Sequence, residues 1–183
     1  MKKYLITSQE FYTDNKKLFA HRLQEQILKH TPDYILYRDK SSAHYKEIAK
    51  IFLSIRSEFA GVKAFLHGEV ELAFELKADG VHLTSTQFDK IELAKSLGLK
   101  VVISSHSYED VLSAQKLGAD YVTYSPIFVS PNKGKPKGVE DLQKLLEKTE
   151  IKVFALGGIV SHEQIDLVEE SGVYGFASIR HFY

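Results

Sequence analysis

Short apolar runs alternate along the chain with stretches whose apolar residues recur at helical spacing. The runs predict eight strands, at residues 4–7, 34–38, 62–67, 80–83, 101–104, 121–124, 153–156 and 174–178. The stretches between them predict helices within residues 18–28, 45–59, 70–76, 91–97, 111–117, 142–146 and 165–168. Strands separated by helices indicate parallel βαβ units, and near-continuous apolar strands indicate a sheet covered on both faces.

An open doubly wound sheet and a closed TIM (β/α)8 barrel both use such units. Eight strands without a Gly-x-Gly-x-x-Gly after the first favour the barrel. We therefore expect an α/β fold, a TIM (β/α)8 barrel formed by residues 1–183 as a single domain. The chain reaches Tyr183 just past the eighth strand, so we expect the eighth helix to be missing at the C-terminus. Another subunit, which would make a homodimer, or the segment before the second strand should cover the outer face of strands eight and one.

Composition narrows the class of protein. The 183 residues suffice for one domain, although barrels of this kind usually have about 200 residues or more. Lys plus Arg and Asp plus Glu number 24 each, so no overall charge draws the chain to nucleic acid or to a membrane surface. The absence of cysteine excludes disulfides and thiolate chemistry. Without a long apolar run or a signal peptide, we expect a cytoplasmic protein.

A glycine pair marks the first candidate site. Gly157 and Gly158 directly follow the seventh predicted strand, and Ala177 and Ser178 end the eighth. In TIM barrels the loops after these two strands commonly bind phosphate, and glycine lets an anion approach the backbone N–H groups closely. The sequence therefore predicts a phosphate site here.

Cations follow the second and sixth strands. Arg38 and Lys40 are two residues apart and should share a face, where they could hold a diphosphate, or else pair with surface carboxylates such as Glu47. Residues 130–138 contain three lysines and two glycines, which is typical of a cationic lid or of a solvated loop. With the glycine pair, we favour a phosphorylated ligand.

Histidines end three successive strands. His67, His82 and His106 could form a zinc site, but no carboxylate stands nearby to orient them, and contacts with substrate or other polar groups are favoured. A nucleophilic serine within residues 104–107 is disfavoured, because no Gly-x-Ser-x-Gly turn surrounds it. We predict no metal ligand.

The order of the motifs resembles that of the thiamine phosphate synthase/TenI family of barrels. The matching segments are residues 38–40 (Arg-Asp-Lys), 78–83 (Ala-Asp-Gly-Val-His-Leu), 104–107 (Ser-Ser-His-Ser), 118–122 (Gly-Ala-Asp-Tyr-Val), 125–128 (Ser-Pro-Ile-Phe) with Lys133, and 155–159 (Ala-Leu-Gly-Gly-Ile). They are similar to the family's Leu-Arg-Glu-Lys, Gly-Ala-Asp-Gly-Val-His-Leu, Ser-x-His-Ser, Gly-Ala-Asp-Tyr-Val, Gly-Pro-Ile-Phe with the lysine of Thr-x-Thr-Lys, and Ala-Ile-Gly-Gly-Ile. The resemblance covers nearly the whole chain.

The synthase joins a pyrimidine diphosphate to a thiazole phosphate and expels pyrophosphate. The resemblance implies that Arg38, Lys40, Ser104 and Lys133 hold the diphosphate, and we count His106 among the candidate catalytic residues. It also implies that a second group binds the thiazole phosphate: Ser130, Asn132, Gly157, Gly158, Ala177 and Ser178. Fixed cations would stabilise the charge that gathers on the leaving pyrophosphate.

The chain departs from the family pattern where the synthase holds Mg²⁺. His67-Gly68-Glu69 stands in place of Asn-Asp-Arg after the third strand, and residues 84–87 stand in place of Gly-Gln-x-Asp after the fourth. Both expected aspartates are absent, so the resemblance makes Mg²⁺ possible but names no ligand for it.

The TenI branch isomerises a thiazole carboxylate phosphate without metal, using a histidine in Gly-His-Val-Phe after the sixth strand. Pro126 takes that position here, so the histidine base of the TenI branch is missing. His67 or His106, at neighbouring strand ends, would have to serve as the acid or base instead. Three functions stay open: a divergent thiamine phosphate synthase, a TenI-type tautomerase, and a catalytically inactive barrel that binds a phosphorylated ligand.

Overall fold

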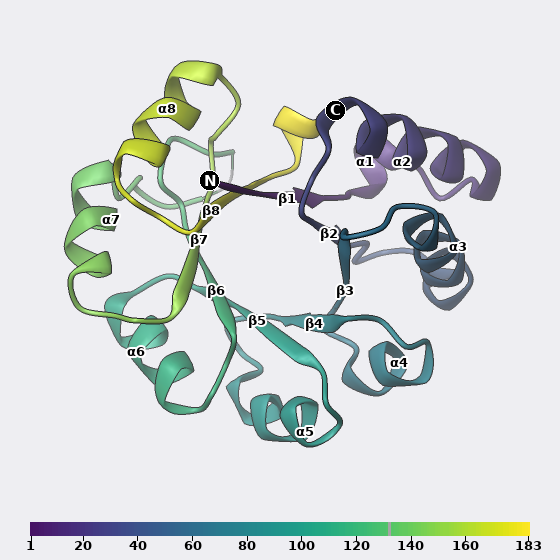
Figure 1. Cartoon of the computed structure of the whole chain (residues 1–183), viewed down its shortest axis with the longest axis horizontal. Coiled ribbons are helices and arrows are strands. Elements are labelled where there is room, and N and C mark those ends of the chain that lie inside the picture. Colours follow the sequence, from purple (N-terminus) through teal and green to yellow (C-terminus); the bar gives the residue numbers. More distant parts are fainter. Residues whose placement is uncertain (132) are drawn as a thin grey trace.

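Eight parallel strands close into a barrel in the order in which they occur along the chain (Figure 1). This computed structural model describes residues 1–131 and 133–183. The strands are β1 (Lys2–Ile6), β2 (Tyr34–Tyr37), β3 (Lys63–His67), β4 (Gly80–Leu83), β5 (Lys100–Ser105), β6 (Tyr121–Tyr124), β7 (Lys152–Leu156) and β8 (Gly175–Ser178). Each overlaps the strand predicted from the apolar runs, and the predicted barrel is confirmed.

Helices surround the strands (Figure 1). They are α1 (Gln9–Tyr12), α2 (Lys16–His30), α3 (Tyr45–Ser57), α4 (Val70–Glu75), α5 (Ile91–Ser96), α6 (Tyr108–Lys116), α7 (Val139–Leu146) and α8 (His162–Glu170). Two 3₁₀ turns accompany them, η1 (Phe88–Lys90) before α5 and η2 (Arg180–Phe182) after β8. The sequence pattern did not predict α1, because four residues are too few to show helical spacing.

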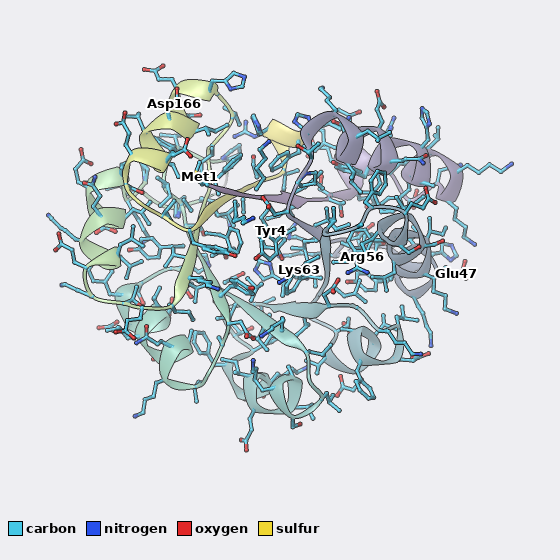
Figure 2. The ribbon with its side chains drawn as sticks, viewed as in Figure 1. Met1, Tyr4, Glu47, Arg56, Lys63 and Asp166 are labelled. Atoms are coloured by element: carbon cyan, nitrogen blue, oxygen red, sulfur yellow. The ribbon has the colours of Figure 1, made fainter. Side chains whose placement is uncertain are left out.

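Side chains of each strand alternate between the barrel interior and the layer under the helices. In β2, Tyr34 and Leu36 belong to the interior cluster, whereas Ile35 and Tyr37 pack in the outer cluster. Figure 2 shows one interior residue, Tyr4, near the middle of the ring of strands. Because both faces are buried, the strands read as continuous apolar runs.

Three tyrosines close the end of the barrel where the strands begin. The hydroxyl oxygens of Tyr34 and Tyr174 lie 2.6 Å apart, and the ring centroids of Tyr34 and Tyr121 lie 5.6 Å apart. The ammonium of Lys152 sits over the rings of Tyr121 and Tyr174, at 5.8 and 5.2 Å from the centroids. This aromatic layer fills the interior, so a ligand can enter only where the strands end.

Two helices begin in capping boxes directly after the strands that border the site. The Ser107 hydroxyl accepts from the N–H of Asp110, whose carboxylate accepts in return, and Ser161 and Gln164 make the same exchange at the start of α8. These bonds satisfy N–H groups that a helix start would otherwise leave unpaired. The loops after β5 and β7 are therefore fixed close to the strand ends.

The outer face of β8 and β1 is covered by the segment before β2, one of the two alternatives that we expected. In the described residues α8 lies between β7 and β8, and β8 itself is followed by η2 and not by the α-helix that would complete the last β/α unit. Phe182 of η2 is fully buried, stacks on Phe176 of β8 with ring centroids 5.5 Å apart, and its carbonyl accepts from the Tyr12 hydroxyl at 3.2 Å. Figure 1 shows this turn beside α1 and α2. Within the same described ranges, no helix is long and apolar enough to cross a membrane.

Replacement of Phe182 by alanine tests this closure. We expect Phe182→Ala to lower the free energy of unfolding by about 3–5 kcal/mol, because a buried aromatic ring is lost and a cavity remains. The matched control is Phe74→Ala, since Phe74 is 53% exposed. Chemical denaturation measures both, and equal losses for the two variants would contradict the role of Phe182.

Candidate active site

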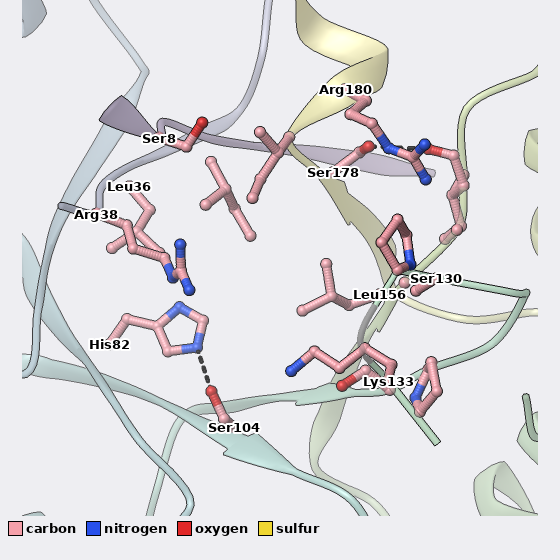
Figure 3. A pocket seen from close by; sticks show the side chains of 18 of the residues that line it. Ser8, Leu36, Arg38, His82, Ser104, Ser130, Lys133, Leu156, Ser178 and Arg180 are labelled. Carbon is pink, nitrogen blue, oxygen red and sulfur yellow. Dashed lines mark hydrogen bonds between the residues drawn. The ribbon is translucent and has the colours of Figure 1, made fainter. Parts of the chain in front are cut away.

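A cavity of about 530 Å³ opens at the end of the barrel where the strands stop (Figure 3). Most of the predicted site residues line this one cavity: Arg38, Lys40, Ser104, His106, Ser130, Lys133, Gly157, Gly158 and Ser178. Ala177 is fully buried within the barrel and is not among the lining residues. Asn132 lies outside the described residues. The roles of all these residues stay predictions, but residues from β2, β5, β7, β8 and the loop after β6 do share one space.

Arg38 and Lys40 reach the cavity because Asp39 turns the other way. Asp39 is buried, and its Oδ1 accepts hydrogen bonds from the backbone N–H groups of Ser41 and Ser42 at 2.9 and 3.0 Å. This local carboxylate turn fixes the backbone after β2. The two cations consequently lie on the same side, as their spacing predicted.

The cations of the cavity repel one another. The pKa of Lys40 is lowered chiefly by the nearby Arg38 guanidinium, then by burial and by Lys133. In the part of the chain that the structure describes, no ion pair joins any of these three to a carboxylate. Glu47, the partner weighed as an alternative, pairs with Lys16 instead. The arrangement suits a multiply charged anion.

The glycine pair after β7 lets the loop after β6 pack against it. Both glycines have positive φ, 99° at Gly157 and 72° at Gly158. A Cβ would lie 2.8 Å from Cα of Pro126 at Gly157 and 2.6 Å from the carbonyl oxygen of Val129 at Gly158. Side chains are therefore excluded by the neighbouring backbone as well as by conformation.

Backbone N–H groups remain available at this bend. The carbonyls of Leu156 and Gly157 accept from Ile127 and Phe128. Among the bonds found in the described residues, the N–H groups of Gly158 and Ile159 donate to no acceptor. Two adjacent N–H groups at a strand end form an anion-binding concavity.

Across the cavity from Arg38, a fourth cation and two hydroxyls stand near the glycine pair. Figure 3 shows Ser130, Ser178 and Arg180 on that side. The Ser178 hydroxyl donates to the carbonyl of Ile159 at 2.8 Å and so ties the loop after β7 to β8. Sequence reasoning missed Arg180, although its position two residues beyond Ser178 was a usable signal.

A buried hydrogen-bond chain leads from the barrel interior to Ser104. The Tyr4 hydroxyl lies 3.0 Å from Nδ1 of His82, and Nε2 of His82 lies 3.1 Å from the Ser104 hydroxyl (Figure 3). Tyr4 and His82 are almost fully buried, and burial lowers the pKa of His82 well below its usual value. The neutral ring carries one proton. Because Nδ1 is the hydrogen-bond partner found for the buried Tyr4 hydroxyl in the described residues, we assign the ring proton to Nε2, which then donates to Ser104. The Ser104 hydrogen is then free to donate into the cavity.

His67 is a neutral imidazole beside the cations. Burial, with the nearby charges of Arg38 and Lys40, lowers the pKa of His67 from 6.5 to about 4. Its ring centroid lies 6.2 Å from that of His82, which faces it across the β3–β4 pair. At neutral pH this wall of the cavity is thus polar but uncharged.

His106 lies at the rim of the cavity, and its hydrogen bond to Ser125 indicates which ring nitrogen carries the hydrogen. Nδ1 lies 3.1 Å from the carbonyl oxygen of Ser125, which can only accept, so Nδ1 carries the hydrogen. Nε2 is left as a basic nitrogen. The imidazole therefore stands next to the Ser125–Pro126 bond, at the end of β6.

The geometry does not favour the zinc alternative. Both ring nitrogens of His82 take part in hydrogen bonds, and Nδ1 of His106 is occupied. Within the described ranges, no cluster of three or more His, Asp or Glu side chains is arranged to hold a metal ion.

Comparison with known proteins shows the family to which a chain with this site belongs. The model of the thiamine monophosphate synthase family matches residues 3–182. The chain belongs to this family. A protein of Aquifex aeolicus (strain VF5) named as a candidate thiamine-phosphate synthase 2 is 34% identical, over 98% of this chain and 96% of that protein. The thiamine-phosphate synthase of Lactococcus lactis subsp. cremoris (strain MG1363) is 28% identical over 84% of this chain and 74% of its own length. Among solved structures, a thiamine phosphate pyrophosphorylase from Pyrococcus furiosus has a TM-score of 0.81 and 30% identity, covering 97% of this chain and 85% of that one.

The residues present do not fit the Mg²⁺ ion that the family resemblance implies. Gly68 and Gln87 occupy the two positions of the expected aspartates, and the Gln87 amide donates to the Gly68 carbonyl at 3.1 Å. Glu69 and Asp89, the nearest carboxylates in sequence, are exposed and do not line the cavity. Mg²⁺ in proteins usually needs one or two carboxylates besides phosphate oxygens, and neither position supplies one.

Replacement of Tyr4 by phenylalanine tests the buried hydrogen-bond chain. We expect Tyr4→Phe to weaken the affinity for inorganic pyrophosphate by about fivefold, since one hydrogen bond that fixes the donor is worth about 1 kcal/mol. Long-range ¹H–¹⁵N NMR on the His82 ring should show Nε2 protonated in the wild type and a less uniform tautomer in the variant.

The matched control for that experiment is Tyr34→Phe, which removes a buried hydroxyl at the opposite end of the barrel. It should leave pyrophosphate binding unchanged. A His82 ring protonated at Nδ1 in the wild type would refute the direction of the chain.

The buried histidines predict how stability varies with pH. An unfolded histidine takes up a proton near pH 6.5, whereas folded His67 does so only near pH 4, so acid favours the unfolded state in this window. We expect the Tm to fall as pH is lowered from 7.5 to 5. The fall should be smaller in His67→Gln, and identical pH profiles for the two proteins would contradict the assignment.

Proposed function

We propose that residues 1–183 act as one barrel domain that catalyses the thiamine phosphate synthase reaction. In that reaction a pyrimidine diphosphate and a thiazole phosphate give thiamine phosphate and pyrophosphate. The observation that carries the proposal is the shared cavity, which is lined by three cations close enough for Arg38 and Lys133 to lower the pKa of Lys40, and by a paired-glycine bend. Family membership supports the same reaction.

The diphosphate is assigned to the side with Arg38, Lys40 and Lys133. The bond between the pyrimidine's methylene carbon and the diphosphate oxygen breaks, and the oxygen keeps the electron pair, so negative charge grows on the leaving pyrophosphate. Cations and a hydroxyl donor already held in place stabilise that charge without reorganising. Ser104 supplies the hydroxyl, because with the ring proton of His82 assigned to Nε2, 3.1 Å away, the Ser104 oxygen accepts and its hydrogen is free.

The thiazole phosphate is assigned to the opposite side. The N–H groups of Gly158 and Ile159 and the guanidinium of Arg180 face this region, with Ser130 close by. A phosphate held there would place its thiazole ring toward the centre of the cavity. The ring nitrogen would then form the new bond to the methylene carbon.

Apolar side chains lie between the two anion-binding regions. Ile6, Leu36, Leu156 and Ile179 line the cavity, and Leu36 and Ile6 also belong to the interior cluster. A volume of about 530 Å³ is within the range of small-molecule sites. Two flat heterocycles would be shielded from water over this surface.

A second function, TenI-type tautomerisation, is favoured by one observation. His106 presents a basic Nε2 beside Pro126, the position at which the TenI branch has its histidine. A base there could move a proton on a bound thiazole carboxylate phosphate. The homodimer and the cytoplasmic location also stay predictions.

A reaction screen with a matched pair of variants tests the proposal. The protein is given pyrimidine diphosphate and thiazole phosphate, and separately the thiazole carboxylate tautomer. We expect thiamine phosphate in the first assay, with kcat/KM lowered about 100-fold in Lys133→Ala, as when one fixed transition-state donor is removed. Lys135→Ala, in the same loop but outside the cavity lining, should behave as the wild type.

The outcomes separate the functions. Turnover of the tautomer alone, lost in His106→Gln, would replace the synthase by the isomerase. No turnover of either substrate would leave the inactive binding barrel.

A further inference from the structure

We propose that this protein binds the diphosphate as the metal-free anion, with protein cations supplying the charge that a divalent ion would otherwise supply. The inference rests on the proposed function, because it concerns the diphosphate side of the same cavity. It goes beyond that function by changing the chemical species that binds: the free diphosphate and not its metal complex.

The first argument is that the side-chain amide of Gln87, after β4, is hydrogen-bonded to neighbouring protein groups after β3 and β4. The Gln87 side chain donates from Nε2 to the Gly68 carbonyl at 3.1 Å. Its Oε1 accepts from the backbone N–H of Thr84 at 3.0 Å and from the Thr84 hydroxyl at 3.1 Å. The amide is neutral and committed to protein partners, so a cation at this wall would find no anionic oxygen.

The second argument is the distribution of carboxylates. Among the described lining residues Glu10 of α1 carries the carboxylate, and it follows β1, the strand that pairs with β2. Asp39 stands between the two strand-2 cations in sequence, but its Oδ1 is held by the turn after β2. The described lining thus carries four cations, Arg38, Lys40, Lys133 and Arg180, against the single carboxylate of Glu10, so a divalent ion would meet net positive charge.

The third argument is the positive charge itself. Arg38, Lys40 and Lys133 lie close enough for the first and last to depress the pKa of Lys40, and burial lowers the pKa of Arg38. Arg38 is half-buried, whereas Lys40 and Lys133 are exposed, and an anion that contacts all three would offset their mutual repulsion. A diphosphate carries three to four negative charges near neutral pH, which three cations can largely balance.

The two modes of binding predict opposite effects of Mg²⁺. The ion forms a complex with pyrophosphate in solution and so lowers the concentration of the free anion. A site that binds the complex gains affinity when Mg²⁺ is added, whereas a site for the free anion loses it by mass action.

The test is calorimetric titration of the full chain with inorganic pyrophosphate, first with EDTA and then with millimolar Mg²⁺. We expect binding in EDTA, and an apparent Kd raised in Mg²⁺ by the factor by which the metal lowers the free anion. Lys133→Ala should weaken binding in EDTA, and Lys135→Ala should not.

An unchanged or tighter affinity in Mg²⁺ overturns the inference while the proposed function stands. Binding in EDTA without any turnover of substrates overturns the proposed function while the inference stands. Absence of binding in both conditions overturns both.

A gain-of-function variant adds an independent readout. Gly68→Asp with Gln87→Asp restores two carboxylates, and a Cβ at position 68 would meet only the Gln87 side chain, at 3.6 Å or more. Its positive φ of 75° is one that aspartate tolerates better than most residues. In this variant Mg²⁺ should tighten pyrophosphate binding. In the control Gln87→Ala, which adds no charge, Mg²⁺ should still weaken binding as in the wild type. A double variant that retains the wild-type sign would count against the carboxylates as the deciding feature.

Discussion

Repulsion among Arg38, Lys40 and Lys133 is the constraint on which the site depends. Like charges disperse unless the backbone holds them, and here each is anchored by a feature that does not itself touch ligand. The buried Asp39 turn fixes the first two. The loop that carries Lys133 is held against β7 because Gly157 and Gly158 leave room for Pro126 and Val129. Folding thus holds these three like charges near one another, and a bound anion would reduce the repulsion between them.

The glycine pair therefore has two roles, of which the sequence indicated only the first. The N–H group of Gly158 donates to no acceptor in the described residues, and Gly158 lines the cavity. The missing side chains of the pair also seat the neighbouring loop, so that the phosphate side and the diphosphate side are built on the same two residues. A side chain there would displace the loop after β6, so the bend and the loop cannot be altered separately by a substitution at these two positions.

Much of the fold could be predicted from the sequence because it rests on local periodicity and on the order of the units. The strand ends that carry Arg38, Ser104 and Gly158 followed from that order, since parallel strands of a barrel end at one rim. Tyr4, helix α1 and the Gln87–Gly68 contact could not be predicted in the same way, whereas Arg180 was missed although its spacing from Ser178 was a signal. Tyr4 reads as an ordinary core residue, α1 is too short to show a period, and a contact between β3 and β4 loops depends on side-chain direction. The protonated nitrogen of His82 follows from three residues that are far apart in the chain.

The turn η2 contributes to both the packing of the barrel and the lining of the cavity. Phe182 completes the apolar layer outside β8, and Arg180, two positions earlier, faces the cavity. Fraying of these few residues on heating would at once expose the sheet and displace the guanidinium. The thermal stability of η2 and the binding of a ligand by Arg180 are consequently coupled. A ligand in the cavity should therefore protect η2 from opening on heating.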